Sequence, residues 1–423
     1  MKLSRNRRNK RIIRNITDTI SSKTFIKITT VLIGIIAVCI GIILCKNYQD
    51  KLEFAKQKEK LNKQIEAIFT ETSKNIENVN SNKKDVILSF STVGDILCGD
   101  EMLEDAYDKE NNTYSFDPMF ENIKDIFKKS DINIGTMETN YTSDKYSGYG
   151  KRNSPKEFAQ AVKNSGINLV SICTNHSLDY GIEGLKSTKN YLQDLGFTTV
   201  GDSTENNRVT ITTIKNIKIA FLSYTYGLEE QQNKSKEELK NINIYNEKIA
   251  KEDLKYAKEN AEFTFVIMHW GEDFQTKKSK EQEKIADFLV KNGANIIIGN
   301  HPAVPQPIEI RKNKDGENVL IAYSLGNYIS SIVNEKSKVE LFLNIKLRKR
   351  AEDGKVVLNN VDYIPVYVLD NGKKAKNRYE LINLRETAKK YANGEETKIN
   401  KKTYKKLIQG LEFLENEILP KTK

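Results

Sequence analysis

Residues 86–100 read VILSFSTVGDILCGD, and this stretch sets a pattern that recurs along the chain. Its first half is a continuous run of apolar and hydroxyl side chains rich in β-branched residues, which predicts a strand buried on both faces. The run gives way to Gly94 and Asp95, so a carboxylate follows the strand directly. The stretch therefore predicts a buried strand with an acidic side chain at its carboxyl end.

Six further apolar runs follow along the chain, at 167–173, 217–224, 263–270, 294–299, 319–325 and 339–347. Helical periodicity marks five other segments, at 117–129, 154–165, 181–195, 246–260 and 279–292. Strands that alternate with helices are typical of α/β folds. The stretch 305–367 departs from this alternation, because it is mostly strand-like with hairpin spacing around a turn at Asn313–Asn318. The pattern therefore predicts an α/β sandwich with mixed sheets.

The positive charge of the chain is concentrated at its N-terminal end. The 423 residues include 68 Lys and Arg against 57 Asp and Glu, a net charge of +11. Residues 1–47 hold ten Lys and Arg and the single acidic residue Asp18, so they carry +9 and leave only +2 for the rest. A nearly neutral body argues against a basic face for nucleic acid. Four cysteines in a chain of this length exclude a disulfide scaffold.

The basic N-terminal segment contains an apolar run that predicts a membrane anchor. Ile28–Cys45 holds 18 uncharged residues, and together with residues 24–26 it is long enough to span a bilayer of about 30 Å as a helix. The basic flank places the N-terminus in the cytoplasm and the body outside the cell. A cleaved signal peptide is disfavoured, because the run exceeds the usual apolar core of about 7–15 residues and no Ala-x-Ala-like site follows.

These features divide the chain into five parts. We expect a basic cytoplasmic tail at 1–24, a single-pass anchor at 25–45, a charged stalk at 46–84, the folded domain at 85–370 and a charged helical extension at 371–423. The stalk carries a thin apolar stripe that would allow weak coiled-coil pairing. The extension shows helical periodicity over 402–418.

Polar side chains follow the predicted strands at the points where these end. The set includes all three histidines of the chain: Asp95, Glu138, Asn175, His176, Asp179, His269, Glu272, His301 and Asn327. Ligands of α/β sheets bind outside the carboxyl ends of the strands. Each residue taken alone has a structural reading, as a turn residue, a helix cap or a surface ion pair. Their joint placement favours one shared polar site.

The residue types in this set are those that bind divalent metals. Imidazole, carboxylate and the Asn carbonyl suit Mn²⁺, Zn²⁺ or Fe better than Cu(I), which prefers thiolate or thioether. Cys98 and Cys173 also lie near two strand ends. They are interpreted as small buried apolar residues, while a disulfide between them stays open on the oxidising side of a membrane.

Residues 86–330 resemble the CapA family of poly-γ-glutamate capsule biosynthesis proteins, which is related to the calcineurin-like metallophosphatases. The matching motifs are VGDIL (93–97), METNYT (137–142), TNHSLDYG (174–181), HWGED (269–273), GNHPAVPQPIE (299–309) and YSLGNY (323–328). The resemblance implies a four-layer α/β sandwich, an extracytoplasmic location, and a role in making or anchoring poly-γ-glutamate or a related surface polymer.

The resemblance also implies a set of metal ligands. The residues that match one metal position of the superfamily are Glu138, Asn175, His269 and His301. The other position retains only Asp95 and Glu138, because Leu97 and Ala303 stand where the superfamily has histidines. We therefore expect one divalent metal ion per chain, namely Mn, Zn or Fe.

Catalytic and substrate-binding roles follow from the same resemblance. His176 is the candidate general acid, since an imidazole exchanges protons near neutral pH, and Asp95 is the second candidate catalytic residue. Residues beside these motifs are expected to contact substrate: Asp179, Trp270, Glu272 and Asn327.

Three functions remain open from the sequence. The protein is a metal-dependent hydrolase or transferase of capsule synthesis, a non-catalytic accessory protein that binds or exports the polymer, or a metal-dependent phosphoesterase with another substrate. The expected partners are the membrane, an anionic polymer such as poly-γ-glutamate, and other membrane proteins of capsule synthesis, with no nucleic acid. The sequence does not decide the oligomeric state.

Overall fold

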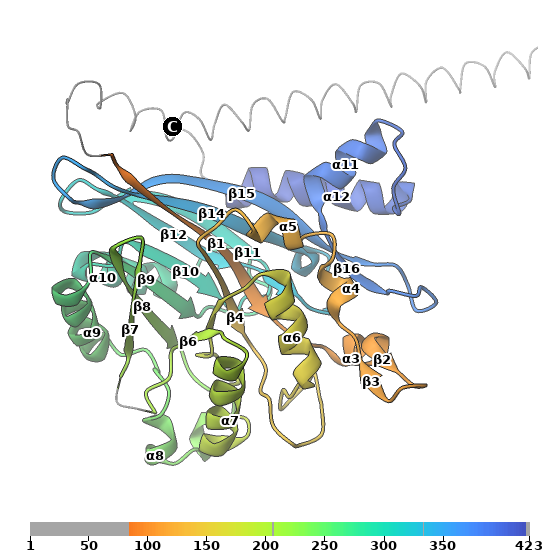
Figure 1. Ribbon diagram of the computed structural model, residues 1–423, viewed down its shortest axis with the longest axis horizontal. Coiled ribbons are helices and arrows are strands. Elements are labelled where there is room, and N and C mark those ends of the chain that lie inside the picture. Colours follow the sequence, from red (N-terminus) through yellow and green to blue (C-terminus); the bar gives the residue numbers. More distant parts are fainter. Residues whose placement is uncertain (1–83, 205–206, 333, 420–423) are drawn as a thin grey trace, which may run out of the picture. The chain divides into compact units, whose positions relative to one another are not determined.

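The computed structural model describes residues 84–204, 207–332 and 334–419 (Figure 1). The predicted cytoplasmic tail and anchor lie outside the described residues, as does the stalk except for its last residue, Lys84. Within the described ranges, no helix is long and apolar enough to cross a membrane. The anchor at 25–45 and the domain boundaries therefore stay predictions.

The first sheet is mixed, has eight strands and is built around β1 (Val86–Ile96), the strand predicted from residues 86–93. Its order is β16-β15-β14-β1-β4-β5-β6, and β13 also pairs with β1. The strands β1, β4, β5 and β6 run parallel, whereas β14, β15 and β16 run antiparallel. The bounds are β4 (Ile132–Met137), β5 (Leu169–Ser171), β6 (Thr198–Val200), β13 (Asn327–Ile329), β14 (Val339–Lys349), β15 (Val356–Asp370) and β16 (Tyr379–Asn383).

The second sheet has six strands in the order β11-β12-β10-β9-β8-β7. Its centre is parallel, and each edge is closed by an antiparallel hairpin, with the predicted turn at Asn313–Asn318 joining β11 to β12. The bounds are β7 (Val209–Ile214), β8 (Ile217–Thr225), β9 (Phe263–His269), β10 (Ile296–Asn300), β11 (Pro305–Lys312) and β12 (Asn318–Leu325). A separate two-stranded ribbon pairs β2 (Tyr107–Asp108) with β3 (Thr113–Tyr114).

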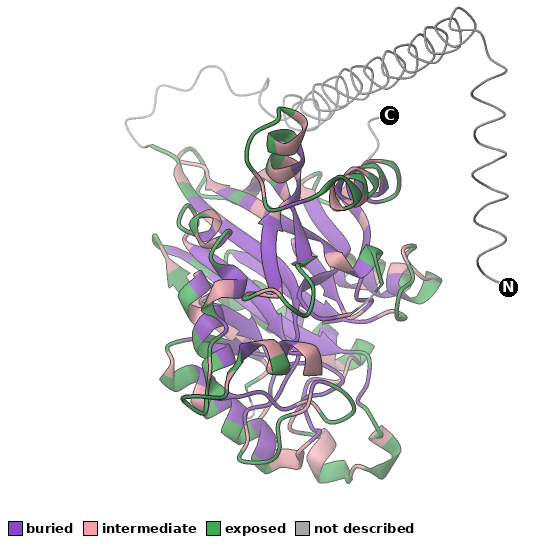
Figure 2. Ribbon diagram, turned by 90° about the vertical axis from the view of Figure 1, so that its right-hand side faces the viewer, coloured by how far each residue is buried: buried purple, intermediate pink, exposed green. Residues whose placement is uncertain are grey.

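The two sheets pack face to face, and helices cover their outer faces. Phe90 of β1 contacts Phe221 of β8 and Phe265 of β9, with ring centroids 6.5 and 5.9 Å apart. Helices α9 (Glu247–Asn260) and α10 (Lys280–Asn292) pack on the second sheet, and α4 (Asp117–Phe120), α6 (Lys156–Ser165) and α7 (Gly181–Asp194) pack on the first. Figure 2 shows that most strand residues are buried in consequence. The predicted α/β body with mixed sheets is thus confirmed.

The predicted helix over 117–129 is wrong in one respect, because the segment forms two short helices. Helix α4 ends at Phe120 and α5 (Lys124–Phe127) begins after Ile123. Ile123 has a φ of −125°, outside the helical range, and this turn buries its side chain completely. Burial of an apolar side chain thus interrupts a segment whose spacing alone favours one helix. The remaining helices are α3 (Asp100–Ala106), α8 (Lys236–Leu239), α11 (Leu384–Ala392) and α12 (Lys401–Phe413), the last lying within the periodic stretch 402–418 apart from its first residue.

A close backbone contact joins the ends of β1 and β12. Gly94 lies against Gly326, where a Cβ on Gly94 would sit 1.8 Å from the Gly326 carbonyl oxygen. The Asp95 amide donates to the same carbonyl at 3.1 Å, and Asp95 then pairs with Asn327 of β13. Only glycine tolerates so close an approach. This contact brings the carboxyl ends of the two sheets together.

Candidate metal centre

The carboxyl ends of the parallel strands from both sheets meet at a cleft of about 360 Å³. Glu138 follows β4, the Asn175–His176 pair follows β5, and His301 follows β10. Five of the predicted site residues line this cleft: Glu138, Asn175, His176, His301 and Asn327. The shared polar site expected from strand ends is therefore present.

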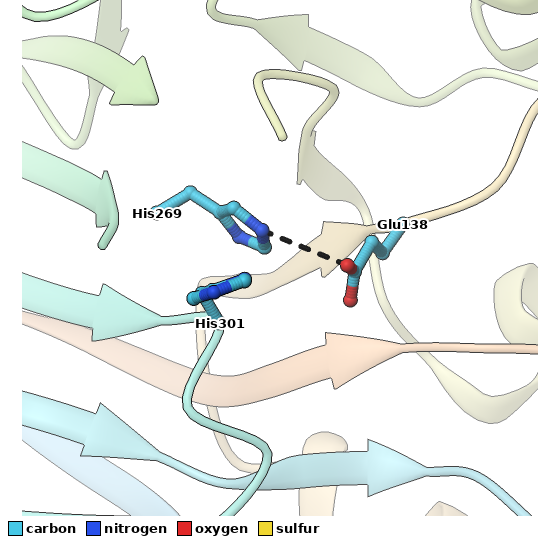
Figure 3. A group of neighbouring side chains, drawn as sticks. All are labelled: Glu138, His269 and His301. Carbon is cyan, nitrogen blue, oxygen red and sulfur yellow. Dashed lines mark ion pairs between the residues drawn. The ribbon is translucent and has the colours of Figure 1, made fainter. Parts of the chain in front are cut away.

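Three of the predicted metal ligands converge at the cleft, where Glu138 and His301 line it and His269 is fully buried beside them. One ligand atom each of Glu138, His269 and His301 lies within 4.8 Å of the others (Figure 3). The Nε2 atom of His269 is 3.6 Å from Oε1 of Glu138 and 2.8 Å from Oδ1 of Asn175. The rings of His269 and His301 meet edge to face, with centroids 4.8 Å apart. The fourth predicted ligand, Asn175, thus points at the same atoms.

Two of these separations fit a shared divalent cation. Ligand atoms about 2.0–2.2 Å from one ion lie at most about 4.4 Å apart, and the 2.8 and 3.6 Å distances at Nε2 of His269 are within that limit. The bound of 4.8 Å on the whole three-ligand group is slightly wider. The pKa of His269 also indicates an environment that favours a cation. Burial would lower the pKa of His269, but the carboxylates of Asp95 and Glu138 raise it to about 9. The site therefore attracts positive charge at the ring nitrogens, and a metal ion would replace that proton.

His301 has the opposite electrostatic environment. Burial and the neighbouring His269 lower the pKa of His301 to about 3, so its imidazole is neutral and has a lone pair for a metal. Its backbone has a φ of +95°, and Ala303 has a φ of +58°. Positive φ is uncommon outside glycine and often marks a functional loop.

Asp95 lies behind the three-ligand group and is not a member of it. Its Oδ2 atom accepts a hydrogen bond from the His301 amide at 2.7 Å, and its Oδ1 atom is 3.4 Å from Nδ1 of His269. The side chain is fully buried, and burial together with Glu138 raises the pKa of Asp95. Asp95 therefore contacts His269 and His301, while its roles as a catalytic residue and a metal ligand stay predictions.

His176 lines the cleft beside the metal ligands and is oriented by Asp179. Nδ1 of His176 lies 2.8 Å from Oδ2 of Asp179, and the same oxygen accepts a hydrogen bond from the Arg152 amide at 2.8 Å. Asp179 is buried and is not among the residues that line the cleft. The structure thus places Asp179 against His176, whereas the sequence suggested a contact with substrate.

Trp270 and Glu272 do not face the cleft. Trp270 is 1% exposed, its Nε1 atom donates to the Tyr323 carbonyl at 2.8 Å, and its ring stacks on Tyr323 in the core under α10. Successive side chains at a strand end point to opposite faces, so a residue next to His269 is directed away from the site. Glu272 is exposed and lies outside the described lining of the cleft.

Comparison with known proteins assigns the chain to a family. The family model described as bacterial capsule synthesis protein PGA_cap matches residues 89–331, more than half of the chain. The chain belongs to the PGA_cap family. The predicted resemblance is thereby confirmed.

Curated relatives and solved structures were also found. The chain is 26% identical over 299 residues to the capsule biosynthesis protein CapA of Bacillus anthracis, covering 68% of this chain and 69% of the relative. It is 27% identical over 253 residues to the PGA biosynthesis protein CapA of Bacillus subtilis (strain 168), covering 58% and 64%. Similar solved structures include the NAD nucleotidase NadN of Haemophilus influenzae, with 13% identity and a TM-score of 0.44 over 81% of this chain and 58% of that one. They also include the calcineurin-like phosphoesterase YfkN of Bacillus subtilis, with 13% identity and a TM-score of 0.40 over 67% of this chain and 91% of that one.

Several residues that line the cleft of this PGA_cap protein were missed by sequence reasoning. Nη1 of Arg152 lies 2.6 Å from Oε1 of Glu138, and Glu229 accepts a hydrogen bond from Nδ2 of Asn175 at 2.7 Å. Burial would raise the pKa of Glu138, but Arg152 and His269 outweigh it and hold that pKa well below its usual range. The other lining residues outside the predicted set are Tyr149, Tyr226, Asp273, Phe274 and Ile332. Most of them lie on loops without periodicity, so no pattern in the sequence marked them.

The two cysteines of the described part of this PGA_cap protein are unpaired thiols. Both are buried, and burial raises the pKa of Cys98 and of Cys173 far above the usual thiol range. The Cys173 thiol donates to the Asn243 carbonyl at 3.4 Å. Because only the thiolate binds metal well, their reading as small buried apolar residues agrees with the structure.

Proposed function

We propose that this PGA_cap protein acts in the synthesis of poly-γ-glutamate, or of a related anionic surface polymer, as a metal-dependent hydrolase or transferase. The observation that carries the proposal is the convergence of Glu138, His269 and His301 within 4.8 Å in a cleft that also contains His176. Membership of the capsule synthesis family supports the polymer as the substrate class.

The metal would be held by Glu138, His269 and His301, with the Asn175 carbonyl as a fourth ligand. One divalent ion, Mn, Zn or Fe, is proposed per chain, because Leu97 and Ala303 line the cleft without side-chain donor atoms. Such an ion polarises an oxygen of the substrate and lowers the pKa of a bound water.

The protein's own contribution is to orient groups around the reacting bond. Asp179 binds Nδ1 of His176 and fixes the ring, which directs Nε2 toward a substrate in the cleft. In this position His176 would hold and deliver the proton that the leaving group needs. Asp95 holds the backbone amide of His301 and faces Nδ1 of His269, so it would position the His301 loop and the His269 ring before a substrate binds.

We further propose that the chain acts at the outer face of the cell membrane. The support is the basic segment 1–24 followed by the apolar run within 25–45, which favours a single-pass anchor with a cytoplasmic N-terminus. Partners would then be the nascent polymer and other membrane proteins of capsule synthesis.

The test uses the full-length chain in detergent, loaded with Mn²⁺ or Zn²⁺. It is assayed against a γ-linked glutamate oligomer and against a panel of phosphoesters. Metal-dependent cleavage or transfer of the γ-glutamyl oligomer that is lost in His176→Ala is the expected result. Turnover of phosphoesters alone would favour a phosphoesterase, and binding without any turnover would favour a non-catalytic polymer-binding protein. Glu183→Gln is the control, because its side chain is 87% exposed on α7.

A further inference from the structure

Arg152 is the one arginine that lines the cleft among the described residues. Its guanidinium contacts Glu138, and its Nε and Nη1 atoms are buried without a well-aligned hydrogen-bond acceptor in the described part of the chain. The Arg152 side chain is 21% exposed. A guanidinium offers five donors in a planar fork that suits carboxylate and phosphate. Arg152 therefore has more donors than Glu138 can pair, and a ligand in the cleft would meet the exposed part of this side chain.

We infer that Arg152 and the aromatic side chains of the cleft form a subsite for a carboxylate of an acidic polymer segment, next to the metal ligands. This inference rests on the proposed function and names the part of the substrate that the site binds. The chemistry recognised is an anionic oxygen group attached to a chain with apolar and planar portions. Free phosphate shares the anionic oxygens and lacks the chain.

The backbone around Arg152 is fixed in place before any ligand binds. The Arg152 amide donates to Asp179 at 2.8 Å, and the Arg152 carbonyl accepts from the backbone amide and the side-chain amide of Asn140 at 3.1 and 3.0 Å. Asn140 also donates to the His176 carbonyl at 3.0 Å. These bonds fix the backbone of Arg152 to the loop that carries His176, and the ion pair with Glu138 restrains its guanidinium. A preorganised cation loses less entropy when it binds an anion.

The charges of the cleft make anion binding depend on the metal. Three carboxylates, Glu138, Glu229 and Asp273, line the cleft against the single guanidinium of Arg152. A second anion would be repelled by this excess of negative charge. A divalent cation at Glu138 offsets the excess and competes with Arg152 for the same carboxylate. Metal and anion should therefore bind with positive coupling, each raising the affinity of the other.

The mouth of the cleft carries exposed aromatic rings. Tyr149, Tyr226 and Phe274 are 53%, 47% and 45% exposed, and all three line the cleft. Phe274 has a φ of +61°, a backbone conformation that costs energy for a bulky residue, while its ring stays in water. Strain of this kind often marks a binding site. The rings offer flat apolar surface for the methylenes and amides between successive carboxylates.

Calorimetric titration of the full-length chain in detergent tests this subsite. The probes are a γ-linked glutamate pentamer, the corresponding γ-linked isoglutamine pentamer, whose α-carboxylates are replaced by carboxamides, and inorganic phosphate, each with and without Mn²⁺. We expect the glutamate pentamer to bind at least about tenfold more tightly with Mn²⁺, and the isoglutamine pentamer to bind weakly in both conditions. Phosphate should bind weakly too, because it cannot contact the aromatic rings.

Two variants separate a ligand role of Arg152 from a structural one. Arg152→Met should lower the affinity for the glutamate pentamer by about tenfold or more. The affinity for Mn²⁺ should stay equal or rise, because a neighbouring cation is gone. Phe274→Ala should lower the affinity for the glutamate pentamer by a few-fold and leave the affinities for phosphate and Mn²⁺ unchanged. Arg152→Lys keeps the charge without the planar fork and should fall between wild type and Arg152→Met.

Three outcomes would overturn the subsite. The first is equal loss of Mn²⁺ and pentamer affinity in both Arg152→Met and Arg152→Lys, which would indicate a structural role. The second is equal binding of the two pentamers, and the third is Arg152-dependent binding of phosphate alone. His176-dependent turnover with unchanged pentamer binding in Arg152→Met would overturn the subsite and leave the proposed function standing. Arg152-dependent pentamer binding without turnover would support the subsite and contradict the hydrolase.

Discussion

The two groups of side chains that line the cleft differ in what they can bind. One group carries Glu138, Asn175 and His301, with His269 behind them, and offers imidazole, amide and carboxylate atoms to a metal ion. The other group consists of Leu97 and Ala303, which line the same cleft and offer no side-chain donors. The guanidinium of Arg152 supplies a permanent positive charge beside Glu138. Under the proposed function, Glu138 would therefore lie next to one exchangeable metal cation and one permanent cation.

The largest expected effect comes from removing a histidine ligand. His269→Ala and His301→Ala should each abolish tight binding of Mn²⁺ or Zn²⁺, together with any metal-dependent activity. Wild-type protein should gain about 2.7 kcal/mol of stability when free metal is 100-fold above its dissociation constant, and both variants should lose this gain. Thermal melts with and without metal measure it, with Glu183→Gln as the exposed control. Retention of the gain in either variant would contradict the assigned ligands.

The next prediction concerns His176, whose removal should lower turnover and leave the metal bound. His176→Ala should lower turnover by about 10²–10⁴-fold while the metal-dependent gain in melting temperature persists, because His176 lies outside the three-ligand group. Rates and melts are measured on the same preparation. Loss of metal binding in this variant would show that His176 belongs to the ligand set instead.

The placement of polar residues at strand ends predicted the metal-ligand group, but it did not predict Arg152. Continuous buried runs locate β1, β9 and β10, and parallel strands bring their carboxyl ends to one edge, so His269 and His301 were found from the sequence. Arg152 was not found, because it lies on a loop without sequence periodicity. That loop is held by a hydrogen bond that Asn140 donates to the Arg152 carbonyl and by one that the Arg152 amide donates to Asp179.

Two other errors have separate physical causes. Trp270 follows His269 directly, and the alternation of side chains at a strand end would have predicted that it points into the core. The segment 117–129 has apolar spacing compatible with one helix, yet Ile123 is buried by a turn that interrupts it. The first error was avoidable from the sequence, whereas the second depends on tertiary packing.

A smaller effect is expected from the residue that contacts both histidines. Asp95→Asn should weaken metal binding by about 10–100-fold without abolishing it, since Asp95 orients the ligands from behind. Metal titration of the variant measures the change. Complete loss of binding, equal to that of His269→Ala, would make Asp95 a direct ligand.

The smallest expected effect concerns Glu340, a fully buried carboxyl that contacts the amide of Gly94, next to Asp95. Its Oε1 atom accepts a hydrogen bond from the Gly94 amide at 2.7 Å, and burial raises the pKa of Glu340 well above its usual range. The folded protein therefore keeps a proton that the unfolded chain releases, and stability falls as pH rises above the unfolded pKa of about 4.3.

Glu340→Gln removes this pH dependence while keeping an acceptor for Gly94. Its stability should match wild type near pH 4 and exceed it at pH 7 by on the order of 1 kcal/mol. Urea unfolding at both pH values measures the difference, with Glu183→Gln as the control. A variant that is less stable than wild type at pH 7 would show that the ionised carboxylate is stabilising.

Metal content of the purified full-length chain tests the comparison of the two groups most directly. Elemental analysis after exposure to Mn²⁺ and Zn²⁺ and removal of loosely held ions should give one transition metal per wild-type chain. His301→Ala should give none, and Arg152→Met should still give one. Two tightly held ions per wild-type chain, or none, would contradict a cleft with one exchangeable and one fixed cation.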